Sequence, residues 1–213
     1  MIPLEFLQRV LPTEGFYTSI IINSGEAPQQ AFFSTVGELA DYCLMADKNG
    51  NNVYYAVSSF EKKGNRTQKN VCLNKTLFLD IDCGPDKVDQ VDNSGDPIED
   101  KGYATQKLGL AALAKFIAVT GMPRPMIISS GRGLHVYWVL EKGLPPADWQ
   151  PLANALKDKF KVNGFVFDPV VTADSARVLR PVGTHNPKNK AEVVVLMDAA
   201  PTEIQVLQNI LGA

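Results

Sequence analysis

The order of hydrophobic and polar residues predicts a chain in which strands and helices follow one another. Short apolar stretches rich in β-branched and aromatic residues are typical of strands, and apolar residues three or four positions apart are typical of amphipathic helices. Strands are predicted over residues 17–22, 53–58, 76–82, 126–130, 134–140 and 192–197. Helices are predicted between Thr35 and Gly50, over 103–120, over 149–160, and after Thr202.

Capping signals bound these helices. Thr35 and Glu38 have the spacing of a capping box, Gly121 and Pro123 end the 103–120 stripe, and Thr202 is the expected cap of the last helix. Hairpin signals and crossover helices occur together. We therefore predict an α/β (α+β) fold with a mixed or antiparallel sheet flanked by helices. One domain is expected over 1–213, with an N-terminal α/β part at 1–52 and a core at 53–200.

Composition narrows the class of protein. The 213 residues carry 21 Lys and Arg against 23 Asp and Glu, which excludes a uniformly basic nucleic-acid binder but leaves room for a local basic groove. No apolar run approaches the ~18 residues of a membrane span, and the N-terminus lacks signal-peptide features. Three cysteines without a CxxC spacing and only two histidines make a zinc site unexpected. We expect a cytoplasmic protein without a membrane partner.

The stretch LFLDIDCG at 77–84 is the first candidate for chemistry. Alternate side chains of a strand share a face, so Asp80 and Asp82 point the same way, while Leu79 and Ile81 point into the core. Two carboxylates on one face repel each other unless a cation lies between them. This favours an oxygen-ligated Mg²⁺ or Mn²⁺ over a pair of solvated acids. An apolar strand that runs into DxD also occurs in phosphatases of the haloacid-dehalogenase type, in which the first Asp is a nucleophile.

A second candidate is the turn between the strands predicted at 126–130 and 134–140. Ser130, Gly131 and Gly133 let backbone N–H groups approach an anion, and Arg132 adds a permanent charge. His135 is expected to project from the sheet face beside this turn. A plain hairpin with a hydrogen-bonded histidine is the structural alternative, because the turn matches neither a Walker A loop nor a dinucleotide fingerprint.

The third candidate spans 166–190. Asp168 follows an apolar pair, and then comes a dense polar set of Asp174, Arg177, Arg180, Thr184, His185, Asn186, Lys188 and Lys190. If 174–179 is helical, with Asp174 or Ser175 as its cap, Arg177 and Arg180 share a side. One carboxylate followed by many cationic and amide groups suits a triphosphate with its metals better than it suits water.

Taken in this order, the strand-DxD, the SGxGxH turn and the acid followed by RxxRxxGTxN resemble the archaeo-eukaryotic primase (AEP) superfamily. The likeness is to phage- and plasmid-type primases and primase-polymerases, and it runs from about Val53 to Lys190. It implies an RRM-like catalytic core and template-dependent nucleotidyl transfer with two metal ions. The phosphatase alternative fits less well, because Gly84 stands where that class has Thr or Val.

The resemblance assigns roles residue by residue. Asp80, Asp82 and Asp168 would bind Mg²⁺ or Mn²⁺, and with His135 they would form the catalytic set. Ser130, Arg132, His135, Arg180, Asn186 and Lys188 would bind the nucleotide, whereas His185 is expected to be a bystander. The implied partners are a single-stranded DNA template, a primer strand, nucleoside triphosphates and a helicase domain or subunit. For a phage- or plasmid-encoded chain the compartment is the bacterial host cytosol.

Two charged segments flank the DxD strand. Residues 61–75 carry one acid and five bases, of which Lys62, Lys63, Arg66 and Lys69 are the predicted nucleic-acid contacts. Residues 84–102 lack periodicity and predict a solvated acidic loop; its charged residues are Asp86, Lys87, Asp89, Asp92, Asp96, Glu99, Asp100 and Lys101. A non-catalytic nucleic-acid-binding domain of a replication initiator is the alternative function from another class.

Overall fold

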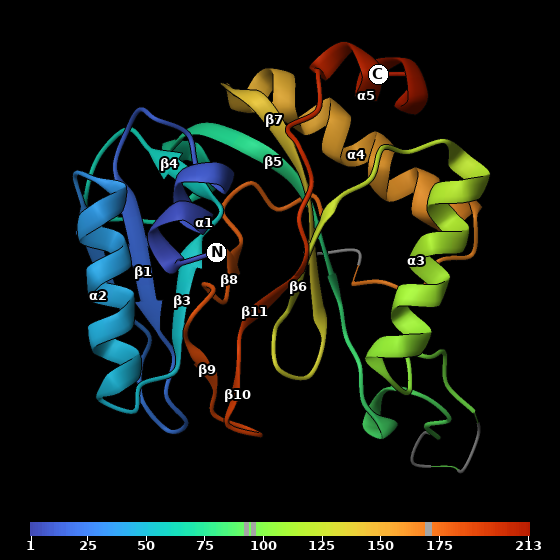
Figure 1. Cartoon of the computed structure of the whole chain (residues 1–213), viewed down its shortest axis with the longest axis horizontal. Helices are drawn as coiled ribbons and strands as arrows, with labels where there is room; N and C mark the ends of the chain where they lie inside the picture. The colour runs from blue at the N-terminus through green and yellow to red at the C-terminus, as the bar shows by residue number, and fades with distance from the viewer. Residues whose placement is uncertain (92–93, 95–96, 169–171) are drawn as a thin grey trace.

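The computed structural model describes residues 1–91, 94, 97–168 and 172–213, and Asp92 and Asp96 of the predicted acidic loop lie outside these ranges. Within them the chain forms five α-helices, a four-stranded sheet, a five-stranded sheet and a small two-stranded ribbon. All strand pairs of these sheets are antiparallel. Figure 1 shows the two larger sheets beside each other, with helices on both flanks.

The first sheet has the order β2-β1-β3-β8. Its strands are β1 (Tyr17–Ile21), β2 (Gln29–Phe33), β3 (Val53–Ala56) and β8 (Val178–Leu179). Helix α2 (Val36–Lys48) packs on this sheet, and its capping box is confirmed: Thr35 Oγ1 accepts from the Glu38 N–H, and the Glu38 carboxylate accepts from the Thr35 N–H. β1 belongs to the N-terminal part expected at 1–52 and β3 to the core expected at 53–200, and the two strands pair with each other.

The second sheet has the order β11-β6-β7-β5-β4. Its members are β4 (Ser58–Phe60), β5 (Val71–Ile81), β6 (Met126–Ser129), β7 (Leu134–Leu144) and β11 (Val194–Met197). α3 (Gln106–Thr120) and α4 (Pro146–Val162) lie on the side away from the first sheet, and α5 (Ile204–Leu211) lies beside α4 (Figure 1). The short elements are η1 (Gln68–Asn70), η2 (Pro85–Lys87), β9 (His185–Asn186) and β10 (Ala191–Glu192).

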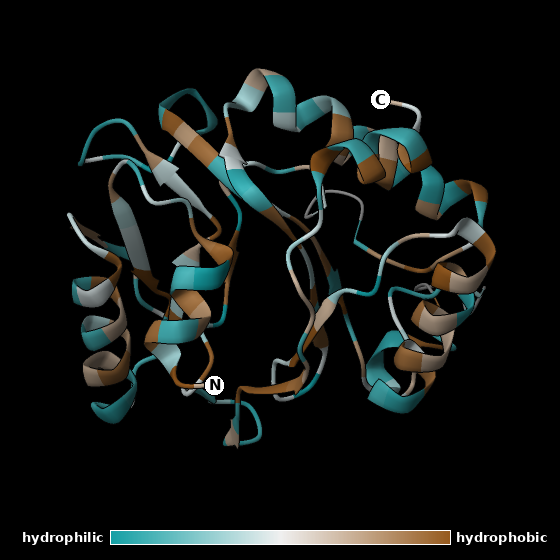
Figure 2. Cartoon of the chain, turned by 45° about the horizontal axis from the view of Figure 1, so that its top comes forward, coloured by the Kyte–Doolittle hydropathy of each residue, from teal (hydrophilic) through white to brown (hydrophobic). Residues whose placement is uncertain are grey.

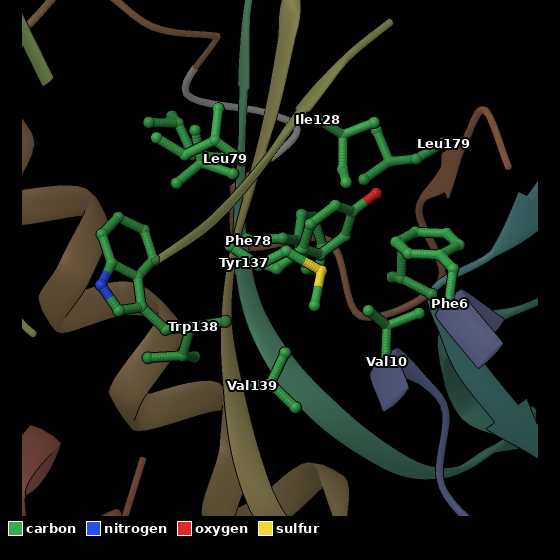
Figure 3. Packing of buried hydrophobic residues seen from close by; sticks show 14 of the residues in the cluster. Phe6, Val10, Phe78, Leu79, Ile128, Tyr137, Trp138, Val139 and Leu179 are labelled. Carbon is green, nitrogen blue, oxygen red and sulfur yellow. The ribbon is translucent and has the colours of Figure 1, made fainter. Parts of the chain in front are cut away.

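Helix α1 (Pro3–Val10) fills the space between the two sheets. The ring of Phe6 meets Tyr55 of β3 and Tyr137 of β7 edge-on, both at 5.8 Å between centroids, and the Tyr55 hydroxyl hydrogen-bonds that of Tyr137 at 3.1 Å. Figure 3 shows Phe6 and Val10 facing the sheet from the side opposite Trp138. Aromatic packing of this kind fixes the separation of the sheets.

The helices are amphipathic, and Figure 2 shows hydrophobic and hydrophilic residues alternating along them. On α4, for example, Trp149, Leu152, Leu156 and Phe160 are fully buried or nearly so. Among the described residues, none of the helices combines the length and the apolarity that crossing a membrane requires.

The predicted α/β fold with an antiparallel sheet flanked by helices is confirmed, with three local corrections. Residues 53–58 form two strands, because Val57 donates to the Arg177 carbonyl at 3.0 Å and the chain then passes to the other sheet. Residues 174–179 are not helical: Asp174 closes a turn, and Val178–Leu179 pair with β3. The last helix starts after Glu203, so Thr202 is not its cap.

Candidate active site

A cavity of about 480 Å³ opens between the two sheets, and we call it the inter-sheet cavity. Tyr54 of β3 and Val178–Leu179 of β8 line it from the first sheet, while Asp80 of β5 and His135 of β7 line it from the second. Its charged lining consists of Asp80, Asp82, Arg66, Lys87, Arg132, Arg177, Arg180 and Lys188. Six of these side chains are basic and two are acidic, although the chain as a whole carries a net charge of −2. The cavity is therefore strongly cationic around a small acidic centre.

Strand register sets the floor of this cavity. Asp80 on β5 is the direct cross-strand partner of His135 on β7, so the two side chains lie on the same face of the sheet. The His135 Nε2 is 4.0 Å from Asp80 Oδ1. Leu79 and Ile81 face the opposite way and are fully buried, as the alternation in the sequence predicts.

Burial controls the protonation of both floor residues. Burial raises the pKa of Asp80 to about 7, with further increases from the nearby Asp82 and Asp168 carboxylates, while Arg177 and Lys87 oppose the shift. Burial lowers the pKa of His135 to about 3, and the positive charges of Arg180 and Arg177 act in the same direction. His135 is therefore a neutral imidazole at pH 7, able to donate from one nitrogen and accept at the other.

One nitrogen of this imidazole lacks a partner. His135 is only 4% exposed, and its Nδ1 has no hydrogen-bond partner among the described residues. A buried polar atom left unpaired costs roughly 1–3 kcal/mol. Because the His135 side chain lines the inter-sheet cavity, its unpaired nitrogen marks it as a polar group for which the described residues supply no structural partner.

The Gly-rich turn after β6 lies over the same cavity. Gly131 has a φ of +94°, and a Cβ there would come within 2.6 Å of the Asn186 Cβ, so both conformation and space require glycine. A Cβ on Gly133 would collide with the Ile81 carbonyl oxygen of β5. The Asn186 amide donates to the Ser130 carbonyl at 2.9 Å, which ties the turn to β9. Ser130, Arg132 and Asn186 thereby line the same cavity, and Asn186 holds the turn in place.

Arg180 is held from the first sheet. Its guanidinium lies 4.5 Å from the Tyr54 ring centroid, donates to the Tyr54 hydroxyl at 2.7 Å and also donates to the Asn52 side chain. Only 7% of Arg180 is exposed, and burial lowers its pKa. The sequence offers no signal for Asn52 and Tyr54, because they lie 126 positions or more before the residue they orient.

Two further arginines reach the cavity. Arg66, which the sequence assigns to nucleic acid, donates to the Ala176 carbonyl and lines the cavity with Arg177. The Nε atoms of both are buried without a hydrogen-bond partner among the described residues. The RxxR spacing could have identified Arg177 as a lining residue, whereas Arg66 stands among exposed bases in the sequence and could not be separated from them.

Asp82 lies where two cavities meet. It lines the inter-sheet cavity and also a neighbouring cavity of about 820 Å³, which contains Asp168, Glu99, Asp100, Lys101 and Lys161. Lys87 donates to Asp82 Oδ2 at 2.8 Å. Lys87 belongs to the loop that the sequence treats as merely solvated, so its position beside a candidate metal ligand was missed.

The carboxylates suit a divalent cation in chemistry, and they are not assembled into a complete ligand set. Asp80 is close enough to Asp82 and Asp168 for their charges to raise its pKa, and oxygen donors that repel one another are what Mg²⁺ and Mn²⁺ bind. Within the described part of the chain, no three His, Cys, Asp or Glu side chains form a metal-holding group. The structure thus places Asp80 and Asp82 together and leaves Asp168 in the adjoining cavity.

The predicted nucleic-acid contacts separate into two kinds. Lys62, Lys63 and Lys69 are exposed on the segment between β4 and β5, and Lys63 Nζ lies 5.2 Å from the Phe16 ring centroid. Arg66 turns inward to the cavity, as described above. Of these four bases, Arg66 alone lines the inter-sheet cavity.

Comparison with known proteins identifies the fold. No protein-family model matches the chain, and no curated protein matches it either. Solved structures do. The AEP domain of a cyanophage S-2L primase-polymerase superposes with a TM-score of 0.65 at 16% identity, over 98% of this chain and 94% of that one. The catalytic domain of primase RepB′, solved with initiator DNA, gives 0.59 at 12% identity, over 100% and 93%. A second RepB′ structure gives 0.58 at 12% identity, over 99% of this chain and 61% of that chain.

These likenesses cover almost the whole chain, and they show the fold. The chain has the fold of an AEP-type primase catalytic domain, and the resemblance inferred from the DxD strand, the SGxGxH turn and the RxxR segment is confirmed at that level.

Proposed function

We propose that this chain is a nucleotidyltransferase, a DNA primase or primase-polymerase that synthesises or extends primers on a single-stranded DNA template. One observation carries the proposal: inside a cationic lining, the inter-sheet cavity gathers Asp80 of β5 and Asp82 just after it, His135 of β7, and Arg180 just after β8. Paired carboxylates among Arg and Lys suit a triphosphate that arrives with divalent cations.

The residues divide the work by charge and burial. Asp80, Asp82 and Asp168 would hold two Mg²⁺ or Mn²⁺ ions, which when bound supply charge neutralisation and a more acidic attacking hydroxyl. His135, neutral and buried, would donate one hydrogen bond to a phosphate oxygen without needing a counter-charge. Arg180, fixed by Tyr54 and Asn52, would contact the phosphates from the other sheet with little loss of side-chain freedom.

The remaining assignments extend outward from this centre. Ser130 and Arg132 would bind phosphate oxygens at the Gly-rich turn, with Asn186 fixing that turn and Lys188 adding charge at the rim. Lys62, Lys63 and Lys69 would contact the template backbone, and Arg66 would contact the nucleotide. A solved structure of primase RepB′ contains initiator DNA, which supports a DNA partner for the same fold.

A primer-extension assay with labelled nucleotides and Mn²⁺ tests the proposal. The wild-type chain is expected to extend a primer in a template-dependent way. Asp80→Asn/Asp82→Asn should reduce incorporation by at least about a hundred-fold, because the ligands of the metal-dependent step are lost. Asp158→Asn, which changes an exposed acid on α4, is the matched control and should leave incorporation unchanged.

The same assay separates the alternative functions. Equal incorporation by wild type and the double variant would exclude these acids from catalysis. DNA binding without any incorporation by the wild type would instead favour a non-catalytic domain of a replication initiator. Release of phosphate from a phosphomonoester would favour the alternative of a haloacid-dehalogenase-type phosphatase.

A further inference from the structure

A single turn after β5 contacts two of the candidate substrate-binding residues at once. Within η2, Lys87 Nζ lies 2.8 Å from Asp82 Oδ2, and the adjacent Asp86 carboxylate forms an ion pair with the Arg132 guanidinium. Asp82 is a proposed cation ligand, and Arg132 is a proposed phosphate ligand. Lys87 thus places a positive charge on Asp82, the proposed cation ligand, and Asp86 places a negative charge on Arg132, the proposed phosphate ligand.

The backbone holds these two side chains in that arrangement. Gly84, between β5 and η2, has a φ of +146°, and a Cβ at this position would come within 2.6 Å of Arg132 Nη2. The Gly84 N–H donates to the Tyr103 carbonyl at 2.9 Å, and the Lys101 N–H donates to the Lys87 carbonyl at 2.9 Å. The turn is therefore tied at both ends and lies close against the Gly-rich turn.

Both ion pairs are exposed enough to exchange partners. The side chains of Asp82 and Asp86 are 48% and 53% exposed, and those of Lys87 and Arg132 are 26% and 32% exposed. Ion pairs at such exposure contribute little to stability, so a ligand of higher charge can displace them. The buried contacts of Arg180 with Tyr54 and Asn52 offer no such exchange.

We propose that Asp86 and Lys87 form a charge latch that occupies the phosphate position at Arg132 and the cation position at Asp82 until substrate displaces both. This rests on the proposed function, since it takes Asp82 and Arg132 as substrate-binding residues. A free triphosphate must compete with Asp86, and a free divalent cation must compete with Lys87. A metal–triphosphate complex carries both charges, so in one binding event it gives Asp82 and Arg132 new partners in place of Lys87 and Asp86.

Binding measurements on the full chain, independent of activity, test the latch. Mn²⁺ binding is followed by electron paramagnetic resonance without nucleotide, and Lys87→Gln is expected to tighten it about two- to five-fold, because the competing ammonium is gone. Lys87→Arg keeps the charge and should bind like wild type. Lys188→Gln removes another positive charge from the same cavity, and controls for the general change in potential.

The anion side is tested with a non-hydrolysable nucleoside triphosphate in EDTA, by calorimetry. Asp86→Asn should tighten binding about two- to five-fold, and Asp100→Asn, another acid of the same loop, should have a smaller effect. Equal effects of Lys87→Gln and Lys188→Gln, or of Asp86→Asn and Asp100→Asn, would overturn the latch.

Two further variants keep failure of the latch distinct from failure of the proposed function. Asp82→Asn should weaken Mn²⁺ binding, and Arg132→Gln should weaken triphosphate binding. If they do and the latch variants behave like their controls, only the latch is wrong. If Asp82→Asn and Arg132→Gln bind like wild type, the proposed site itself is wrong, and the latch falls with it.

Discussion

The floor and the rim of the inter-sheet cavity are built in different ways. The floor residues Asp80 and His135 sit on β5 and β7, two 11-residue strands paired in register over a buried core. The rim residues Asp86, Lys87 and Arg132 sit on turns, and ion pairs with substantial exposure hold them. Core packing therefore fixes the side chains of the floor, whereas exposed ion pairs hold the side chains of the rim, on turns that hydrogen bonds tie to the rest of the chain.

This difference has a functional meaning. A side chain that orients reacting groups gains from a rigid support, because small displacements are costly to catalysis. A side chain that admits or excludes a ligand gains from contacts that are cheap to break. The floor is thus suited to positioning and the rim to exchange, and four predictions test how sharp the division is.

The largest effect is expected beneath the floor. Leu79 is fully buried on the face of β5 opposite Asp80, and Leu79→Ala should lower the free energy of unfolding by about 2–5 kcal/mol through lost burial and a residual cavity. Lys87→Gln, in the rim, should lower it by less than about 1 kcal/mol. Urea denaturation of both measures the contrast, and equal losses would show that floor and rim are not distinct in stability.

The next largest effect concerns the two buried polar groups that face the cavity. His135→Ala and Arg180→Ala should each weaken binding of a nucleoside triphosphate by about 1–3 kcal/mol, because each removes a preoriented hydrogen-bonding group. Isothermal titration with Mn²⁺ present measures the change. Tyr54→Phe removes one of the bonds that orient Arg180 and keeps the aromatic face, so it should show a smaller loss in the same direction. Unchanged titration curves for His135→Ala and Arg180→Ala would remove these residues from the site.

The floor could be predicted from the sequence, and the reason is local. Alternation along 77–82 places Asp80 and Asp82 on one face, and the hairpin at Gly131–Gly133 places His135 beside the Gly-rich turn. The resemblance to AEP primases is what assigned the acids and His135 to one site. The pairing of Asp80 with His135 is a consequence of register, which the buried faces of both strands specify.

The positions of the rim side chains, and of the arginines that line the cavity from the first sheet, could not be predicted, because tertiary contacts decide them. Arg177 and Arg180 would share a side if 174–179 were helical, yet Val178–Leu179 pair with β3, a preference that appears only when the first sheet is present. Lys87 looked like a solvated charge because a side chain's ion-pair partner depends on loop conformation, which periodicity does not encode. Arg66 could not be separated from its exposed neighbours for the same reason.

A smaller effect is expected at a contact that joins the rim to helix α2. Asp47 accepts from the His185 backbone N–H at 2.7 Å, and its other oxygen lies 2.8 Å from His185 Nδ1. The next residues along the chain, Asn186 and Lys188, line the cavity. Asp47→Ala should therefore weaken triphosphate binding by about 0.5–1.5 kcal/mol through a loosened rim, measured by titration.

The chain offers a matched control for this contact. Asp198 forms an ion pair with Arg9 at 3.0 Å, which likewise joins segments remote in sequence but lies away from the inter-sheet cavity. Asp198→Ala should leave triphosphate affinity unchanged. A loss equal to that of Asp47→Ala would mean that the Asp47 contact acts through general stability and not through the rim.

The smallest effect is expected outside the cavity, at the exposed lysines between β4 and β5. If Lys62, Lys63 and Lys69 contact template phosphates, each change to Gln should reduce the slope of log affinity for single-stranded DNA against log salt by about 0.7. Fluorescence anisotropy at several salt concentrations measures the slope. Lys115→Gln, an exposed lysine on α3, should leave it unchanged. Because these side chains lie outside the inter-sheet cavity, nucleotide affinity should stay at the wild-type value in all four variants. A nucleotide defect in the Lys62, Lys63 or Lys69 variant would place that lysine in the rim and extend the exchangeable region beyond the turns.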